Sequence, residues 1–178
     1  MTYIHHCDSP LGAITLAGNQ TALTGLWFDG QKYFGSTISG QMEKSNLPVF
    51  EETKRWLAVY FSGKDPGFLP QLSLNATPFR KAVWEILLSI PFGQTMTYGQ
   101  IADKIAKQRG IKKISAQAVG GAVGNNPISL IIPCHRVVGS NGSLTGYAGG
   151  IEKKIALLTL EKAETSKLFI PKEETAPQ

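Results

Sequence analysis

Residues 97–124 read TYGQIADKIAKQRGIKKISAQAVGGAVG, and this stretch predicts two short helices joined by a basic turn. Thr97 and Gln100 have the spacing of a capping box at the start of the first helix, and Gly110 lies where its C-terminal cap is expected. Ser115 is placed to begin the second helix. Such a pair is typical of a helix-turn-helix, although similar pairs also occur in ordinary helical cores. The basic turn favours nucleic-acid binding, and the core interpretation stays open.

Helices are also predicted on both sides of this pair. Thr77 and Pro78 have the N-cap and first-turn positions of a preceding helix, which we expect Pro91 to end. A last amphipathic helix is expected to follow Gly149–Gly150, because apolar residues recur there from Ile151 at helical spacing. The second half of the chain is therefore predicted to be mainly helical.

The first half has a different pattern. Short β-rich runs at residues 3–6, 13–17 and 22–28 are separated by turn signals and predict an antiparallel meander, and residues 49–61 predict one helix. A loop rich in Pro and Gly between Lys64 and Asn75 is the candidate boundary. We therefore predict an α/β domain over residues 1–75, a helical domain over 76–167 and a flexible tail over 168–178.

Charge and composition narrow the class of protein. The 178 residues carry a net charge of +5. Residues 1–74 hold five basic against six acidic side chains, and the remainder holds thirteen against seven, so the helical half is strongly basic. That asymmetry favours a polyanionic partner, although a solvated basic face gives the same charge. No run of residues is apolar enough to span a membrane and the start lacks a signal-peptide pattern, so we expect a cytoplasmic protein.

Residues 129–138, SLIIPCHRVV, carry the chemistry, because they insert a thiol, an imidazole and a guanidinium into an apolar run. Pro133 cannot donate a backbone hydrogen bond, so regular pairing should break beside Cys134. Cationic neighbours are expected to lower the pKa of this thiol and make it a nucleophile. The alternative is an inert buried cysteine. Behind this run, Asn141–Gly142 predicts a turn that folds the following residues into a hairpin.

The sequence around the second cysteine does not favour a metal site. Cys7 lies beside His5 and His6, but a structural zinc site needs about four ligands at suitable spacing, and the neighbouring sequence does not offer them. We assign Cys7 to packing and expect both cysteines to be thiols. No phosphate-binding loop, dinucleotide fingerprint or zinc motif is present, so we predict neither a metal nor a cofactor.

The motif PCHRVVG at residues 133–139, together with GYAGG at 146–150, resembles the signature of the O6-alkylguanine-DNA alkyltransferases, also called methylated-DNA–protein-cysteine methyltransferases. The resemblance extends over the helical half, while the first half fits the family's variable domain in outline. It implies a small ribonuclease-H-like N-terminal domain followed by a winged helix-turn-helix DNA-binding domain.

The resemblance also implies a reaction. The family binds duplex DNA through the minor groove, rotates an O6-alkylguanine out of the stack and moves the alkyl group to its own cysteine, once per molecule and without a cofactor. Extrusion is necessary because a thiolate cannot reach the lesion inside a duplex. The implied protein is a monomer. Activity on O4-alkylthymine and cooperative loading on DNA stay open.

The resemblance implies roles for individual residues as well. Cys134 matches the nucleophile, His135 the general base and Glu161 the carboxylate that orients it. Asn126 matches the asparagine that bridges the recognition helix to the active-site loop. The implied contacts to the flipped guanine come from Tyr98, Cys134, Val137, Tyr147 and Ala148. The implied DNA contacts come from Thr97, Tyr98, Ser115, Ala116, Gln117, Ala118, Gly120, Arg136 and Ser140.

One position departs from the family pattern. Gln117 stands where many members have an arginine that fills the space left by the flipped base, which predicts weaker retention of that base or another lesion preference. The sequence leaves three alternative functions: a non-catalytic lesion sensor, a Cys-His hydrolase and a transcription regulator. Cys134 argues against the sensor, the basic helical half against the hydrolase, and the lack of an added activator segment in this sequence against the regulator.

Overall fold

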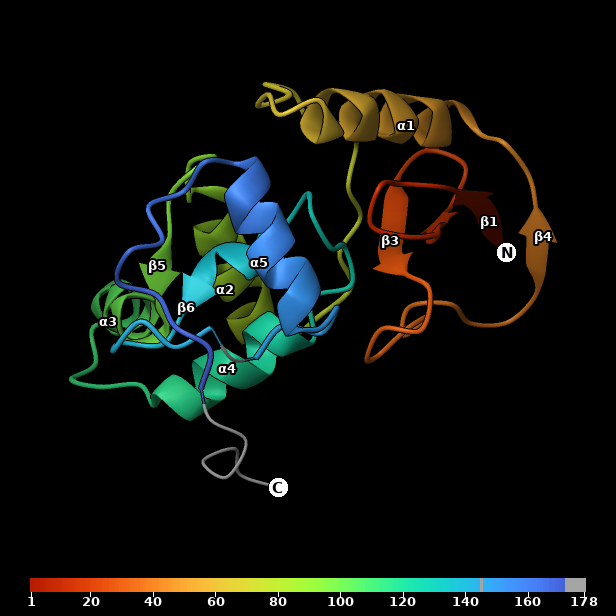
Figure 1. Ribbon diagram of the computed structural model, residues 1–178. Helices are drawn as coiled ribbons and strands as arrows, with labels where there is room; N and C mark the ends of the chain where they lie inside the picture. Colours follow the sequence, from red (N-terminus) through yellow and green to blue (C-terminus); the bar gives the residue numbers. More distant parts are fainter. Residues whose placement is uncertain (145, 172–178) are drawn as a thin grey trace. The chain divides into compact units, whose positions relative to one another are not determined.

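The computed structural model describes residues 1–144 and 146–171, and the chain divides into two compact units (Figure 1). The first unit contains Met1–Ala76 together with the short segment Pro127–Ile131. The second contains Thr77–Asn126 and the chain from Ile132 onward. The segment 127–131 thus belongs to the first unit, although it lies within the range that the sequence assigned to the helical domain.

A four-stranded sheet forms the first unit. Strands β1 (Thr2–Cys7), β2 (Ile14–Gly18) and β3 (Leu23–Phe28) pair antiparallel in chain order, which confirms the predicted meander. A fourth strand, β4 (Met42–Lys44), pairs parallel with β1 and gives the order β3-β2-β1-β4. The sequence does not predict β4, because its three exposed residues show no apolar alternation.

Neighbouring segments cover the outer edge of β3. The amide of Leu26 donates to the Pro127 carbonyl at 2.9 Å, and the amide of Ser129 donates to the Leu26 carbonyl at 2.9 Å. Residues 71–73 bond Leu23 in the same way. An unpaired edge would expose a row of backbone donors and acceptors, so these segments complete the sheet.

Helix α1 (Pro48–Phe61) lies over this sheet in Figure 1 and begins one residue before the predicted helix. Its buried face includes Phe50, Trp56 and Tyr60, and the ring of Phe50 stacks on that of His5 with centroids 5.9 Å apart. Burial of such large rings is the main source of stability for a unit of this size.

The second unit is built from α2 (Pro78–Leu88), α3 (Tyr98–Arg109), α4 (Ala116–Gly124) and α5 (Ile151–Leu160). The predicted caps are confirmed: the side chains of Thr77 and Ser115 accept from backbone amides, Thr97 and Gln100 form a complete capping box, and Gly110 is left-handed with φ 66°. Helix α2 ends three residues before Pro91, because the Ser89 and Ile90 amides bond in tighter turns.

Helices α3 and α4 form the predicted helix pair and pack on α2. The indole Nε1 of Trp84 donates to the Ala122 carbonyl at 2.8 Å and ties α2 to α4. Ile101 and Ile105 of α3 and Val119 of α4 are fully buried. The apolar faces of these helices therefore pack against one another, and the exposed residues of α4 are Gln117 and the small residues Ala116, Ala118 and Gly121.

A two-stranded parallel sheet, β5 (Met96–Thr97) with β6 (Val137–Val138), links the start of α3 to the segment after Cys134. The predicted turn at Asn141–Gly142 forms, because the Gly139 amide donates to the Ser143 carbonyl at 2.8 Å, but no antiparallel strand pair extends from it among the described residues. The chain does turn at Gly142, where φ is 94°, but Leu144 then donates to the Phe169 carbonyl and Phe169 donates to that of Gly142. Strand β6 already has β5 as its partner, so the C-terminal segment pairs with the turn instead.

The start of the predicted flexible tail is held in place. Leu168 packs against a small core of Val138, Leu144 and Leu158, and Phe169 makes the backbone bonds described above. Residues 172–178 of that tail lie outside the described residues. Within the described ranges, no helix is long and apolar enough to cross a membrane.

Candidate active site

A single turn of 3₁₀ helix, η1 (Cys134–Arg136), holds the cysteine. Pro133 precedes it with φ −81° and ψ 67°, and the Cys134 amide donates to the Ile132 carbonyl at 2.8 Å. The predicted break in regular pairing is therefore confirmed. The turn leaves Cys134 only 6% exposed.

His135 and Glu161 form a buried pair beside this cysteine. The imidazole Nε2 lies 2.6 Å from Oε2 of Glu161, at the end of α5. Burial would raise the pKa of Glu161, but its bonds and charge interactions with His135 and Arg136 outweigh burial and lower that pKa to about 2. Burial lowers the pKa of His135 more than Glu161 raises it. The ring is thus neutral near pH 7, and Nε2–H donates to the carboxylate while Nδ1 is the basic nitrogen.

Cys134 is a neutral thiol at rest. Burial raises its pKa above the ordinary value, although hydrogen bonding from Asn126 and the charge of Lys154 act in the opposite direction. The expectation that cationic neighbours lower this pKa overall is wrong, because Arg136 directs its guanidinium to Glu161 and the thiol is fully desolvated. A base is therefore needed to generate the thiolate.

Asn126 ties α4 to the cysteine turn. It follows the C-terminal end of α4 and is 4% exposed. Its Nδ2 donates to the Ile132 carbonyl at 2.7 Å, two residues before Cys134. A change in the position of α4 would reach the cysteine turn through this bond.

Lys154 is a functional candidate that the sequence analysis missed. It is fully buried on α5, and its Nζ donates to the Val137 carbonyl at 2.5 Å. Burial lowers its pKa to about 8, against the opposing effect of Cys134. The helical spacing could have indicated its burial, because Lys154 lies three residues after Ile151 and one turn before Leu158, on the apolar face of α5.

An open groove of about 540 Å³ runs between the start of α3, helix α4 and the loop after β6. It is lined by Tyr98, Gly99, Ala116, Gln117, Gly120, Gly139, Ser140, Asn141 and Ser143. Burial, and secondly the charge of Cys134, raise the pKa of Tyr98 to about 12, so its hydroxyl keeps its proton near neutral pH. A Cβ on Gly146 would lie 2.6 Å from the Tyr98 hydroxyl, so only glycine fits there.

Tyr147 forms a second aromatic wall of the site. Its ring meets that of His135 edge-on, with centroids 6.3 Å apart. The side chain is 9% exposed, and among the described residues its hydroxyl has no hydrogen-bond partner. A buried hydroxyl in this state is ready to bond a ligand.

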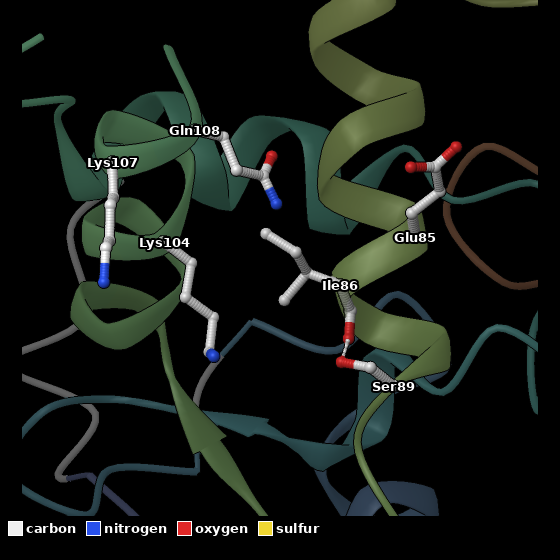
Figure 2. Close-up of a pocket in the computed structure, with 6 residues that line it drawn as sticks. All are labelled: Glu85, Ile86, Ser89, Lys104, Lys107 and Gln108. Atoms are coloured by element: carbon white, nitrogen blue, oxygen red, sulfur yellow. Dashed lines mark hydrogen bonds between the residues drawn. The ribbon is translucent and has the colours of Figure 1, made fainter. Parts of the chain in front are cut away.

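A second hollow of about 470 Å³ lies between α2 and α3 and contains none of the predicted site residues (Figure 2). Figure 2 shows the side chains of Lys104 and Gln108 on one wall and Ile86 and Ser89 on the other. The Ser89 hydroxyl already donates to the Ile86 carbonyl. This hollow is separate from the cysteine site.

Comparison with known proteins decides the family. A model described as "6-O-methylguanine DNA methyltransferase, ribonuclease-like domain" matches residues 2–74, and one described as "6-O-methylguanine DNA methyltransferase, DNA binding domain" matches residues 78–163. The chain belongs to the 6-O-methylguanine DNA methyltransferase family. This membership confirms the resemblance and the predicted fold class of a ribonuclease-like domain followed by a DNA-binding domain.

Individual members of the family are similar over most of their length. The methylated-DNA–protein-cysteine methyltransferase of Mycobacterium bovis is 43% identical over 163 residues, which cover 92% of this chain and 94% of that protein. The enzyme of the same name from Methanosarcina barkeri is 44% identical over 160 residues, covering 90% and 97%. The crystal structure of Mycobacterium tuberculosis OGT in complex with DNA matches with a TM-score of 0.78 at 42% identity, covering 90% and 92%.

The structure brings most residues implied by the family together. His135 bonds Glu161, Asn126 bonds the segment before Cys134, and Cys134 and His135 share one 3₁₀ turn, while Tyr98, Ala116, Gln117, Gly120 and Ser140 share the groove. Ser115 caps α4, and Val137 offers its carbonyl to Lys154. Thr97 caps α3, the Ala118 amide donates to the Ser115 hydroxyl, and Ala148 lies in the loop before α5.

Arg136 is the exception among the implied DNA contacts. It is 8% exposed, and its guanidinium donates to Glu161 and to the Ile90 carbonyl. These bonds hold three of its five N–H donors inside the fold, which argues against the implied DNA contact; that contact stays a prediction. Within the described residues, no group of three His, Cys, Asp or Glu side chains is placed to hold a metal ion.

Proposed function

We propose that this protein repairs DNA directly by moving the alkyl group of O6-alkylguanine to its own Cys134, once per molecule. The observation that carries the proposal is the buried His135–Glu161 pair, 2.6 Å apart, whose histidine follows Cys134 in one 3₁₀ turn of the unit that also holds the helix-turn-helix and its groove. Residues 1–75 serve as a scaffold domain and residues 76–167 carry the reaction.

The bound substrate is a duplex held through its minor groove by one protein molecule. Helix α4 enters the minor groove of the DNA. The alkylated base leaves the base stack, because a buried thiol cannot reach it inside the duplex. Tyr98 and Tyr147 flank the extruded base. The Val137 and Cys134 carbonyls accept from the guanine amine, and the Ala148 amide donates to its O6.

The transfer is a displacement at carbon. Nδ1 of His135 takes the proton of the Cys134 thiol through a water molecule, and Glu161 stabilises the imidazolium that forms. The thiolate sulfur bonds the alkyl carbon as the carbon–O6 bond breaks, and the electron pair of that bond stays on guanine. The protonated Tyr98 hydroxyl donates to the leaving base, which is restored as guanine when it takes up a proton. The thioether is stable, so no second cycle follows.

The test is intact mass and peptide mapping after equimolar mixing with a duplex that carries one O6-methylguanine. We expect a gain of one methyl group on Cys134, restored guanine and no turnover beyond one equivalent. Cys134→Ser should bind the duplex and gain no mass. Cys7→Ser is the matched control and should react like the wild type, because Cys7 belongs to the first unit.

The other outcomes separate the alternatives. Binding of the lesion without any gain of mass would replace the proposal with a lesion sensor. Multiple turnovers with a small ester, together with no preference for the lesion, would favour a Cys-His hydrolase.

A further inference from the structure

Arg136, which follows His135 in the chain, is buried and directs its guanidinium into the protein. Its Nε donates to Oε1 of Glu161 at 2.8 Å and its Nη2 to Oε2 at 3.2 Å. Nη1 donates to the Ile90 carbonyl at 2.7 Å, and the guanidinium lies 5.8 Å from the centre of the Phe92 ring. A planar fork of this kind holds a carboxylate in one orientation, which an ammonium cannot do.

Both oxygens of Glu161 are shared between two partners. Oε1 accepts from Arg136 and from the Gly93 amide at 2.9 Å, while Oε2 accepts from Arg136 and His135. Gly93 has φ 82°, and a Cβ there would lie 3.0 Å from the Glu161 carbonyl oxygen. Arg136 and residues 90–93 therefore form a clamp around Glu161.

We propose that Arg136 is a positioning residue for His135: it fixes Glu161 as an ionised carboxylate and takes up half of its hydrogen-bonding capacity, so that His135 stays a neutral base. The inference rests on the proposed function. It assigns to the arginine of the PCHR motif a role inside the active site in place of a DNA contact.

The charges around His135 give the physical reason. Glu161 at the end of α5 is the anion that faces the ring, while Arg136 from η1 and Lys154 from α5 are cations that oppose protonation. Cys134 and Tyr147 are neutral near pH 7, because burial raises both pKa values. Without Arg136, the full charge of Glu161 would act on the imidazole and raise the pKa of His135. The base would then be protonated over more of the physiological range.

The experiment compares Arg136→Met and Arg136→Lys with the wild type. The single-turnover rate of methyl transfer is measured across pH at saturating duplex, together with DNA affinity and the NMR titration of His135 without DNA. For Arg136→Met we expect an acid limb displaced to higher pH, a matching rise in the pKa of His135 and unchanged DNA affinity. For Arg136→Lys we expect a rate lower by about tenfold, because one ammonium cannot satisfy both carboxylate oxygens, with the acid limb near its original place.

Each other result overturns the inference. Weaker DNA binding with an unchanged pH profile would make Arg136 a DNA contact. A Lys variant with wild-type rate and profile would show that the clamp is not needed, and this variant keeps the charge should the Met variant fail to fold. The NMR titration needs no methyl transfer, so failure of the proposed function, seen as an unreactive wild type, is distinguished from failure of this inference.

Discussion

Three buried charged groups, Glu161, Arg136 and Lys154, decide how the site works at the scale of the residue. Glu161 and Arg136 compensate each other, whereas Lys154 meets a carbonyl oxygen and has a pKa lowered to about 8 by burial. Charges are costly in an apolar interior unless they are paired. The protein therefore accepts a cost in stability at the place where it needs a neutral imidazole and a reactive thiol.

The carboxylate should dominate acid unfolding. Because the folded pKa of Glu161 is about 2 and the ordinary value is 4.5, its contribution is fully present above about pH 4.5 and is lost as the pH falls toward 2. Glu161→Gln should lower the free energy of unfolding by about 3 kcal/mol near neutral pH and flatten its dependence on acid. Urea unfolding across this range measures both. Glu152→Gln, exposed on the same helix, is the control, and parallel pH curves for wild type and Glu161→Gln would contradict the prediction.

Gln117 gives a second residue-scale prediction. It is exposed and lines the groove, at the position where the resemblance implies an arginine in many members of the family. Gln117→Arg should bind lesion duplex more tightly and repair it faster, because arginine adds charge and a stacking plane. Gln108→Arg adds the same charge in the separate hollow between α2 and α3 and serves as the control. Unchanged affinity and rate for Gln117→Arg would refute the idea.

At the scale of the element, the caps set where the helices of the DNA-binding unit begin and end. Gly110 ends α3 in a left-handed conformation that other residues adopt at a cost, and open space surrounds it. Gly121 lies inside α4 with ordinary helical geometry and nothing close to its would-be Cβ. Glycine is therefore favoured by the backbone conformation at position 110, whereas at position 121 the helix would accept a side chain.

Alanine at these positions should change stability in opposite directions. Gly110→Ala should lower the free energy of unfolding by about 1 kcal/mol, and Gly121→Ala should raise it by up to about 1 kcal/mol. Thermal or urea unfolding of both variants measures this, and each acts as the control for the other. Equal signs would mean that the conformation of Gly110 is not the reason for its glycine.

Local signals explain what the sequence predicted among these elements. The caps at Thr77, Thr97 and Ser115 were predictable because each acts within one turn of helix. Strand β4, the pairing of β6 with β5 and the burial of Arg136 depend on segments far apart in the chain, so no local pattern reveals them. The role of Glu161 as the partner of His135 was predicted only from the family resemblance, because no spacing rule connects a carboxylate to a histidine 26 residues earlier.

At the scale of the whole molecule, the charge is concentrated in the half that carries the groove. The turn between α3 and α4 contributes the exposed Lys112 and Lys113, next to the recognition helix. Phosphate neutralisation releases counterions, so binding through such side chains weakens as salt increases. The basic half is therefore expected to supply affinity, and the groove residues to supply recognition of the lesion.

Removing these charges should change the salt dependence of binding. Lys112→Gln and Lys113→Gln should each reduce the slope of log affinity against log salt by about one, with or without a lesion. Lys64→Gln, an exposed lysine of the first unit, is the control and should leave the slope unchanged. Fluorescence anisotropy across a salt series measures the slope. Identical slopes for the three variants would contradict a phosphate role for this turn.

The segment Pro127–Ile131 limits how this protein can be divided. The chain leaves the helical unit after Asn126, contributes a bridge beside β3, and returns at Ile132, only two residues before Cys134. Ile128 and Leu130 of this segment are fully buried. Cutting the chain at one point therefore does not give two complete units. A fragment that begins at Thr77 would keep the apolar segment 127–131 but lose the strand β3 that it pairs with, directly before Cys134. Recombination that exchanges the first half of the gene must also exchange this internal stretch, so the two halves are expected to be inherited together.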